Sequence, residues 1–439
     1  MLNLSRIQVA NCLALSAALQ MQYCPVQAAD SAFDQTFSSG ISAMQQGKLS
    51  QAEKFLKDSL KLEDKDGASE IKRAQSTMVL ADIYKSEKRF PESESLYKQL
   101  ISKFENKPGD QLPAIMNKLA GLYRAEGKYD EALGLYKKSL AVVEKQDGAD
   151  SSSAATVHAN LGLLYQRMQK LKDAEAEEQL AIKIFKAKSG ADSIEVAACM
   201  RDLAPRFLIE NKTKQGIDYL EQAVAIFAKK LPDSLEYANC AEQLGGAYYS
   251  IGRYGDAEDL SRKALAIYEK RSGPNSPDVA IALTNLGGRL EKESKNKEAI
   301  DAYHKSLAIM DKAAAANTDK SNDLTSNISK NLIGLAEVYI DQTDYKRAEN
   351  VLRKDLAIRE KRWGPKHPAL IPALRNLSNC LIIQGTAQEE SDMLRTREQE
   401  ILGQIPMGKR KAINEFIQHE IIKSLDLGTK KERKKSDMW

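Results

Sequence analysis

The 439-residue sequence predicts an all-α fold: a right-handed superhelical α-solenoid of about nine helix-turn-helix repeats. Two observations carry this prediction. Proline is scarce, with 12 residues, and aromatic residues make up only 6% of a chain rich in alanine, leucine, lysine and glutamate, which favours helix. A ladder of a leucine, an aromatic residue, a turn residue and a small residue also returns about every 42 residues, and a fixed period of this length indicates stacked repeats.

The first predicted element is a cleavable export signal over residues 1–28. Arg6 precedes an apolar run from Ile7 to Leu19, and Val26-Gln27-Ala28 ends in the small residue that a signal peptidase requires. A first helix without a targeting role is the alternative. The run is too short to span a bilayer. We therefore expect an exported protein, periplasmic or secreted, with no integral membrane segment once the signal is removed.

The ladder is clearest at Leu244, Tyr248, Gly252 and Ala257. A leucine and an aromatic residue four positions apart form one apolar stripe on a helix, which we name helix A of the repeat. A turn residue that accepts the left-handed conformation ends helix A, and a small residue five positions later lets the following helix B approach closely. Aligning the copies places the turn residues at positions 47, 88, 127, 169, 211, 252, 294, 343 and 385. One hairpin cannot bury this surface alone, so the repeats must stack from about residue 29 to residue 400.

Three places depart from the repeat pattern. The seventh and eighth turns are 49 residues apart, so residues 311–327 should extend helix B or form a protruding loop. Pro205 lies inside a helix A and should kink or shorten it. The last copy places Glu390 where other copies have a small residue. Beyond it, residues 401–439 are predicted to form a capping helix, over 409–427, and a basic tail.

The Leu-Gly-x-x-Tyr step and the small residue after the turn resemble the tetratricopeptide repeat. The longer period and the linker Gly-Pro-Lys-His-Pro at residues 364–368 are similar to the repeats of kinesin light chains. This resemblance implies a non-catalytic scaffold that binds a protein or an extended peptide along its concave face, which is lined by helix A. Two rivals stay open: an accessory or catalytic component in envelope or polymer handling, and a self-associating structural module. The oligomeric state stays open as well.

The resemblance also points to a position for ligand contacts. In kinesin-light-chain-like repeats, the residue before the ladder leucine faces the groove and is often asparagine, whose amide can bond to a peptide backbone. Here that position, which we name the row, holds Asn160, Gln243, Asn285 and Asn376 as candidate binding residues. The remaining row positions carry Val79, Lys118, Asp202 and Gly334. Asparagine is also a well-tolerated polar residue on an exposed helix face, so a role in binding is one of two interpretations.

The sequence contains no motif for catalysis, a metal or a cofactor. Its four histidines, His158, His304, His367 and His419, are far apart, and no phosphate-binding loop, nucleophile elbow or zinc-binding spacing occurs. Cys199 and Cys240 share one repeat position, which predicts small buried residues. The formal net charge of +4 is small for this length, so we expect no nucleic-acid partner. We expect a protein that is not an enzyme and carries no cofactor.

Overall fold

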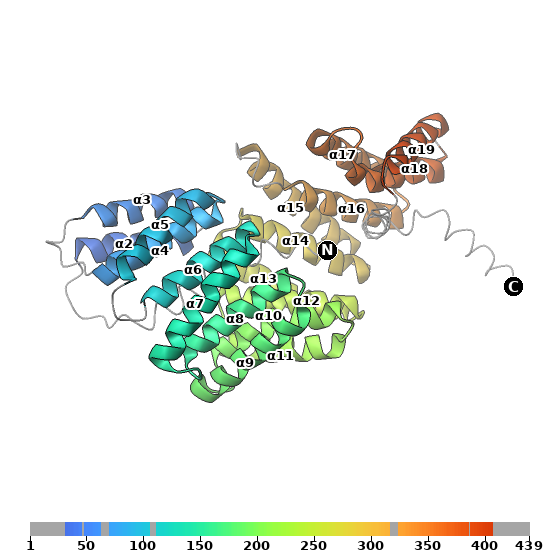
Figure 1. Cartoon of the computed structure of the whole chain (residues 1–439). Coiled ribbons are helices and arrows are strands. Elements are labelled where there is room, and N and C mark those ends of the chain that lie inside the picture. The colour runs from blue at the N-terminus through green and yellow to red at the C-terminus, as the bar shows by residue number, and fades with distance from the viewer. Residues whose placement is uncertain are drawn as a thin grey trace. The chain divides into compact units, whose positions relative to one another are not determined.

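The computed structural model describes residues 31–45, 48–62, 70–105, 111–316, 324–385 and 387–406. These ranges contain helices and no strand, as Figure 1 shows. The predicted export signal, the turn at Gly47, and the predicted capping helix and basic tail lie outside the described residues. Among the helices that are described, none is long and apolar enough to cross a membrane.

The chain divides into two compact units. The N-terminal unit comprises the described residues up to Arg253 together with residues 266–274, and the C-terminal unit comprises residues 254–265 and the described residues from Asn275 onward. The N-terminal unit contains α2 (Ala32–Gln45), α3 (Leu49–Lys61), α4 (Glu70–Ser86), α5 (Phe90–Phe104), α6 (Gln111–Glu126), α7 (Tyr129–Asp147), α8 (Ser152–Arg167), α9 (Leu171–Ser189), α10 (Ile194–Ile209), α11 (Thr213–Lys230) and α12 (Leu235–Ser250).

The C-terminal unit contains α14 (Pro277–Lys292), α15 (Asn296–Ala316), α16 (Thr325–Asp341), α17 (Tyr345–Trp363), the short 3-10 helix η2 (Pro368–Leu370), α18 (Ile371–Gln384) and α19 (Gln388–Gly403). Helix α13 (Tyr254–Ser272) contributes residues to both units. Even-numbered helices are helix A and odd-numbered helices are helix B. The described residues therefore form nine helical hairpins, and the all-α repeat prediction is confirmed.

The predicted turn residues adopt the left-handed conformation. Among the described turns, positive φ angles of 59° to 83° occur at Lys88, Gly127, Gln169, Asn211, Gly252, Ser294, Thr343 and Gly385. After most of these turns, the residue that follows the turn donates its N–H to the carbonyl of the ladder residue five positions earlier, as Lys128 does to Tyr123 at 2.9 Å, and helix B then begins. Local steric rules therefore set where each helix A ends.

The small residue after each turn lies where helix B crosses helix A. It is fully buried in every hairpin, at Ala52, Ser93, Ala132, Ala174, Gly216, Ala257, Ala299, Ala348 and Ser391. Ser93 shows how close the helices come, because its Oγ donates to the carbonyl of Ala81 on the neighbouring helix at 2.7 Å. A larger side chain has no space at this contact.

The linkers between repeats cap the next helix A. Ser151, Ser193, Ser234 and Ser276 are N-cap residues whose hydroxyls accept a hydrogen bond from the backbone N–H three residues later, at 3.1–3.3 Å. His367 plays the same part before η2, because its Nδ1 accepts from the backbone N–H of Ala369 at 3.2 Å. The linker histidine is therefore a capping residue.

One alternative of a sequence expectation is excluded, and another expectation is wrong. Pro205 does not shorten its helix, since α10 has 16 residues, as α8 and α12 do. The small residue of the last hairpin is Ser391 and not Glu390. The cause is a turn one residue longer, in which Ala387 also has a positive φ of 52° and α19 begins three residues after Gly385. Glu390 instead forms an ion pair with Arg353, its Oε2 lying 2.8 Å from Nη2.

The insertion between the seventh and eighth repeats lengthens helix B, as one of the two expectations had it. Helix α15 has 21 residues, whereas α9, α13 and α17 have 19 each. Residues 317–323 lie outside the described residues.

Thr343→Gly tests the role of the turn conformation. A β-branched residue in the left-handed region destabilises the folded state by about 1–2 kcal/mol, and replacing it with glycine removes this strain. Glycine itself loses more backbone entropy on folding, which offsets about 0.5–1 kcal/mol of the gain. We expect a net gain of about 0.5–1 kcal/mol, seen as a higher melting temperature in calorimetry. Thr156→Gly, an exposed position within α8, is the control and should lower the melting temperature. Destabilisation at position 343 would contradict this explanation of the turns.

Candidate functional site

The row in the N-terminal unit is half-buried and still reachable. Lys118, Asn160, Asp202 and Gln243 each retain partial exposure, whereas Val79 is buried at 3%. Each of these residues stands directly before a ladder leucine on α4, α6, α8, α10 or α12, so their backbone positions are equivalent from repeat to repeat. Four of the five row residues in this unit are therefore polar and partly exposed.

The two charged row residues, Lys118 and Asp202, each form an ion pair within the unit. The Nζ of Lys118 lies 2.7 Å from Oδ2 of Asp82, and the hydroxyl of Tyr97 donates to Oδ1 of the same carboxylate at 2.7 Å. Asp202 accepts from Nε of the buried Arg201 at 2.9 Å. Their polar atoms are thus largely satisfied by the protein itself.

The two amide residues of this unit differ from the charged ones. Asn160 has no hydrogen-bonding partner among the described residues, and Oε1 of Gln243 is buried without one. A buried amide oxygen without a donor is costly, and because this oxygen is enclosed, a ligand N–H could bond to it only after the Gln243 side chain rotates. Asn160 and Gln243 are therefore the row residues best suited to bind a peptide backbone.

In the C-terminal unit, other residues of the protein engage or enclose the side chains of the row. Asn285 accepts a hydrogen bond from Nζ of Lys330 at 3.1 Å. Asn376 is fully buried, at 0% exposure, so its amide does not face a ligand surface. Gly334 replaces the polar residue altogether. Of the four predicted binding residues, the structure leaves Asn160 and Gln243 available, ties Asn285 to Lys330 and encloses Asn376.

The gap in the row at Gly334 has a physical cause in Tyr303 of α15. A Cβ atom at Gly334 would lie 2.4 Å from Cζ and the hydroxyl of Tyr303, and a Cβ at Gly287 would lie 2.7 Å from Cε1 of the same ring. The ring is 3% exposed and its hydroxyl lies 3.4 Å from Oε2 of Glu291. The aromatic ring thus fills the space that a row side chain would need.

Gly334→Ala tests this contact. The added methyl group would overlap a ring that cannot move freely, and overpacking of this kind costs about 1–3 kcal/mol. The additional change Tyr303→Leu should recover part of that loss, so the two changes should be non-additive in thermal unfolding. Gly246→Ala is the matched control, because a Cβ there has nothing within 4 Å; it should be neutral or stabilising. Equal effects of the two glycine substitutions would refute the role given to Tyr303.

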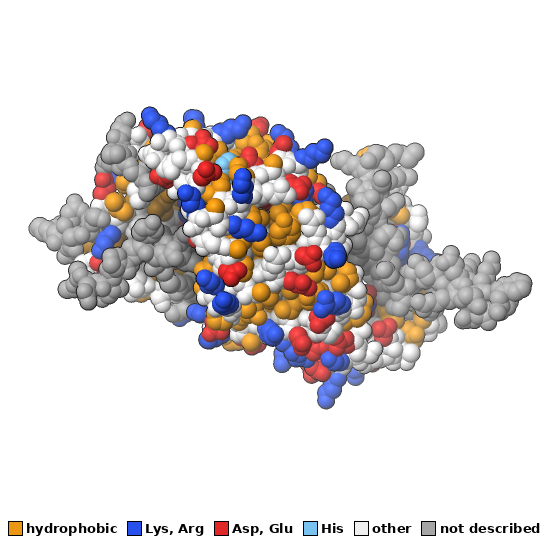
Figure 2. Space-filling model, turned by 90° about the horizontal axis from the view of Figure 1, so that it is seen from below, with side chains coloured by type: hydrophobic (Ala, Val, Ile, Leu, Met, Phe, Trp, Pro, Cys, Tyr) orange, Lys and Arg blue, Asp and Glu red, His pale blue; other side chains and the backbone are white. Residues whose placement is uncertain are grey.

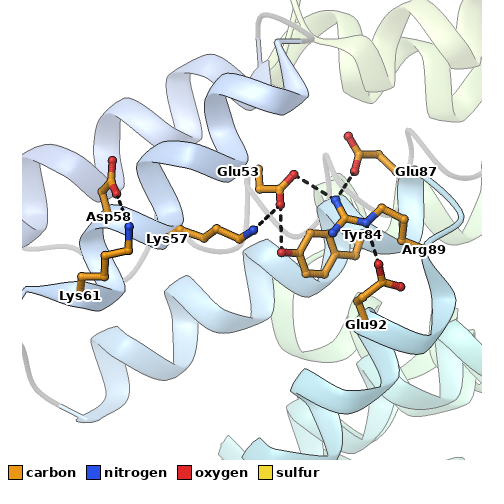
Figure 3. A network of polar contacts seen from close by, with 8 residues as sticks. All are labelled: Glu53, Lys57, Asp58, Lys61, Tyr84, Glu87, Arg89 and Glu92. Atoms are coloured by element: carbon orange, nitrogen blue, oxygen red, sulfur yellow. Dashed lines mark hydrogen bonds and ion pairs between the residues drawn. The ribbon is translucent and has the colours of Figure 1, made fainter. Parts of the chain in front are cut away.

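The ladder aromatic has a polar function that the sequence pattern did not reveal. In Figure 3, the hydroxyl of Tyr84 donates to Oε1 of Glu53 on the preceding helix B at 3.0 Å, and Nη1 of Arg89 lies 3.0 Å from Oε2 of the same carboxylate. The Arg89 guanidinium stacks 3.9 Å from the Tyr84 ring centre. Burial raises the pKa of Glu53, but the hydrogen bonds from Lys57 and Tyr84 and the charge of Arg89 outweigh it, and its pKa falls below the ordinary value.

This arrangement recurs along the N-terminal unit. Tyr123 donates to Glu94 at 2.8 Å below Lys128, and Tyr248 donates to Glu221 at 2.6 Å below Arg253. The tyrosine therefore joins its own helix A to the preceding helix B, in addition to filling the apolar stripe. The sequence signal was the basic residue five positions after the tyrosine, one residue beyond the turn.

The described residues offer no centre for redox or metal chemistry. No group of three or more histidine, cysteine, aspartate or glutamate side chains within them could hold a metal ion. Cys199, Cys240 and Cys380 are free and buried, which confirms the prediction for the first two. Burial raises the pKa of Cys240 to about 12 and of Cys380 to about 11, so both stay protonated and unreactive at neutral pH.

Comparison with protein families identifies the repeats. Tetratricopeptide-repeat models match residues 111–187, 208–270, 237–312 and 332–369, which together make up half of the chain. The chain belongs to the tetratricopeptide-repeat family. The repeats are similar to those of two Arabidopsis thaliana proteins, KINESIN LIGHT CHAIN-RELATED 2 (25% identical over 147 residues, 33% of this chain) and KINESIN LIGHT CHAIN-RELATED 3 (24% over 141 residues, 32% of this chain). Each matching segment spans 22% of the relative.

Solved structures support the fold of this tetratricopeptide-repeat protein. A signal-transduction ATPase with a tetratricopeptide-repeat sensor, from Pyrococcus horikoshii, matches with a TM-score of 0.60 at 12% identity, over 87% of this chain and 55% of that one. The apo form of the quorum sensor NprR from B. thuringiensis matches with a TM-score of 0.52 at 14% identity, over 84% of this chain and 98% of that one. At these identities the likeness concerns the fold alone.

Proposed function

We propose that this protein is a non-catalytic scaffold that binds an extended protein segment on the helix A face of its N-terminal unit. The observation that carries the proposal is the partly exposed amide of Asn160, which has no partner among the described residues and lies in the same row as Gln243, whose Oε1 also lacks a partner. An amide side chain offers one acceptor and two donors, which matches the alternating N–H and C=O groups of a peptide backbone.

Charge and family support a protein as the partner. The face drawn in Figure 2 carries basic and acidic side chains side by side, and the formal net charge is only +4. A nucleic-acid partner would require a basic surface, so it does not fit this chain. Tetratricopeptide arrays are scaffolds, and the fold by itself does not specify a partner.

Changing both Asn160 and Gln243 to Ala tests the proposal. Each lost hydrogen bond should weaken binding by about 0.5–1.5 kcal/mol, so the double variant should lose about 1–3 kcal/mol, or roughly 5- to 150-fold in affinity. Partner proteins are first captured on the chain without residues 1–28. Overlapping peptides that cover the sequences of these partners then serve as ligands, and their affinity is measured by titration calorimetry. Asn285→Ala is the control, because its oxygen is already bonded to Lys330. Unchanged affinity in a folded double variant would place binding elsewhere.

We further propose that the protein is exported and that residues 1–28 are removed. The support is the pattern of the leader, in which one basic residue precedes an apolar run and a small residue follows. N-terminal sequencing of the native protein should find a chain that begins at or near Ala29. A native cytoplasmic protein that retains Met1 would contradict export.

A further inference from the structure

One helix B position, the ninth residue after the turn, lies beneath the helix A layer and is apolar or aromatic in most repeats. Buried leucine or tyrosine occupies it at Leu56, Tyr97, Tyr136, Leu220, Tyr303 and Leu352. In the fourth repeat the same position holds Glu178, which is 2% exposed. A carboxyl group thus occupies a site that most of the other repeats fill with leucine or tyrosine.

Helix α8 leaves space for the carboxyl group of Glu178 but donates a hydrogen bond to only one of its two oxygens. The amide of Gln166 on α8 donates to Oε1 of Glu178 at 2.6 Å. Oε2 is buried and has no hydrogen-bonding partner. A Cβ atom at Gly162 would lie 2.4 Å from Cγ of Glu178, so the carboxyl stem packs directly against the α8 backbone. An ionised carboxylate with one unpaired oxygen in this position would be expensive.

The charged groups around Glu178 come from α9 and α10. Asp202, Arg206 and Cys199 face it from α10, and Glu175 lies on its own helix. Burial first, and then the carboxylate of Asp202, raise the pKa of Glu178 to about 8, against an ordinary value of 4.5. Burial also raises the pKa of the Cys199 thiol, which therefore stays neutral.

Arg206 holds the complementary unpaired atoms. Its side chain is 3% exposed, and Nη1 bonds to Glu175 and to Glu210, each at 2.9 Å. Its Nε and Nη2 are buried without a hydrogen-bonding partner. The interface between α9 and α10 therefore contains an unpaired acceptor on Glu178 and unpaired donors on Arg206 that are not bonded to each other. A neutral carboxylic acid explains why they stay apart, because the strong attraction between the two groups appears only when Glu178 is ionised.

We propose that the contact between the fourth and fifth repeats is a proton-linked joint with Glu178 as its titrating group and Arg206 as its moving partner. With Glu178 neutral, the repeats pack as observed. When Glu178 releases its proton to solvent, Arg206 turns its free N–H groups to the carboxylate, leaves Glu175 and Glu210, and loosens the packing of α9 on α10. The device is independent of what the groove binds.

The linkage has a definite sign. The unfolded chain loses this proton near pH 4.5 and the folded chain near pH 8, so between these values the folded state holds one more proton. Stability therefore falls as pH rises through this window, and the folding equilibrium constant changes by up to about tenfold per pH unit. Glu178→Gln keeps the shape and the hydrogen bond from Gln166 but cannot ionise.

The test compares urea unfolding of the full chain and of Glu178→Gln between pH 5 and 9. The folding constant of Glu178→Gln divided by that of the wild type should rise by up to about tenfold per pH unit up to pH 8, and the ratio should level off above pH 8. Glu144→Gln, an exposed glutamate of α7, is the control and should follow the wild type. Burial raises the pKa of Glu337 in the C-terminal unit to about 7, but all three proteins retain that group. Parallel pH curves for the wild type and Glu178→Gln would overturn the proposal.

A measurement on the wild type alone covers the case in which Glu178→Gln does not fold. Hydrogen exchange followed by mass spectrometry gives protection factors for α9 and α10, corrected for the intrinsic pH dependence of exchange, with α6 and α7 as the internal reference. Protection of α9 and α10 should fall by at least about tenfold between pH 6 and pH 9 relative to that reference, as expected for loss of one linked proton. An unchanged ratio would overturn the joint regardless of the variant.

Discussion

The contact at which helix B crosses helix A, with no bulky side chain between them, determines the geometry of every repeat. Alanine, serine or glycine fills this position in all nine hairpins, and each is fully buried. A larger side chain would force the helices apart at a cost of about 1–3 kcal/mol. Because the contact fixes the distance and register within a hairpin, it also fixes which residues each hairpin presents to its neighbours, including the tyrosine that reaches the preceding helix B.

The sequence was sufficient for those parts of the fold that local steric rules decide. The turn residues could be located because a left-handed residue must end helix A, and the small residues follow at a constant distance. The position of the small residue was predicted wrongly only where this distance changes. Nothing in the sequence Gly385-Thr-Ala387 indicates that Ala387 also takes a positive φ, and the extra residue moves the contact from Glu390 to Ser391.

The candidate site could be predicted only in part, because side chains from other helices decide which row residues stay accessible to a ligand. Asn160 and Asn285 occupy equivalent positions, yet Lys330 engages the second and nothing among the described residues engages the first. The ring of Tyr303 excludes a side chain at Gly334, and burial encloses Asn376. Spacing along a sequence cannot show these contacts. The sequence alone favours an exposed carboxylate at position 178, and only the structure shows that Glu178 is buried with one oxygen unpaired.

The central claim is that the repeats are interchangeable units joined by equivalent contacts, so that stability is roughly a sum over repeats. Deleting residues 128–169, from one turn to the next, tests it most directly, because the deletion removes α7 and α8 while it keeps the order of helix A and helix B. Circular dichroism during thermal unfolding should show a protein that is still helical and cooperatively folded, with a moderately lower melting temperature. Loss of the cooperative transition would contradict the claim and would mean that the N-terminal unit folds only as an indivisible core.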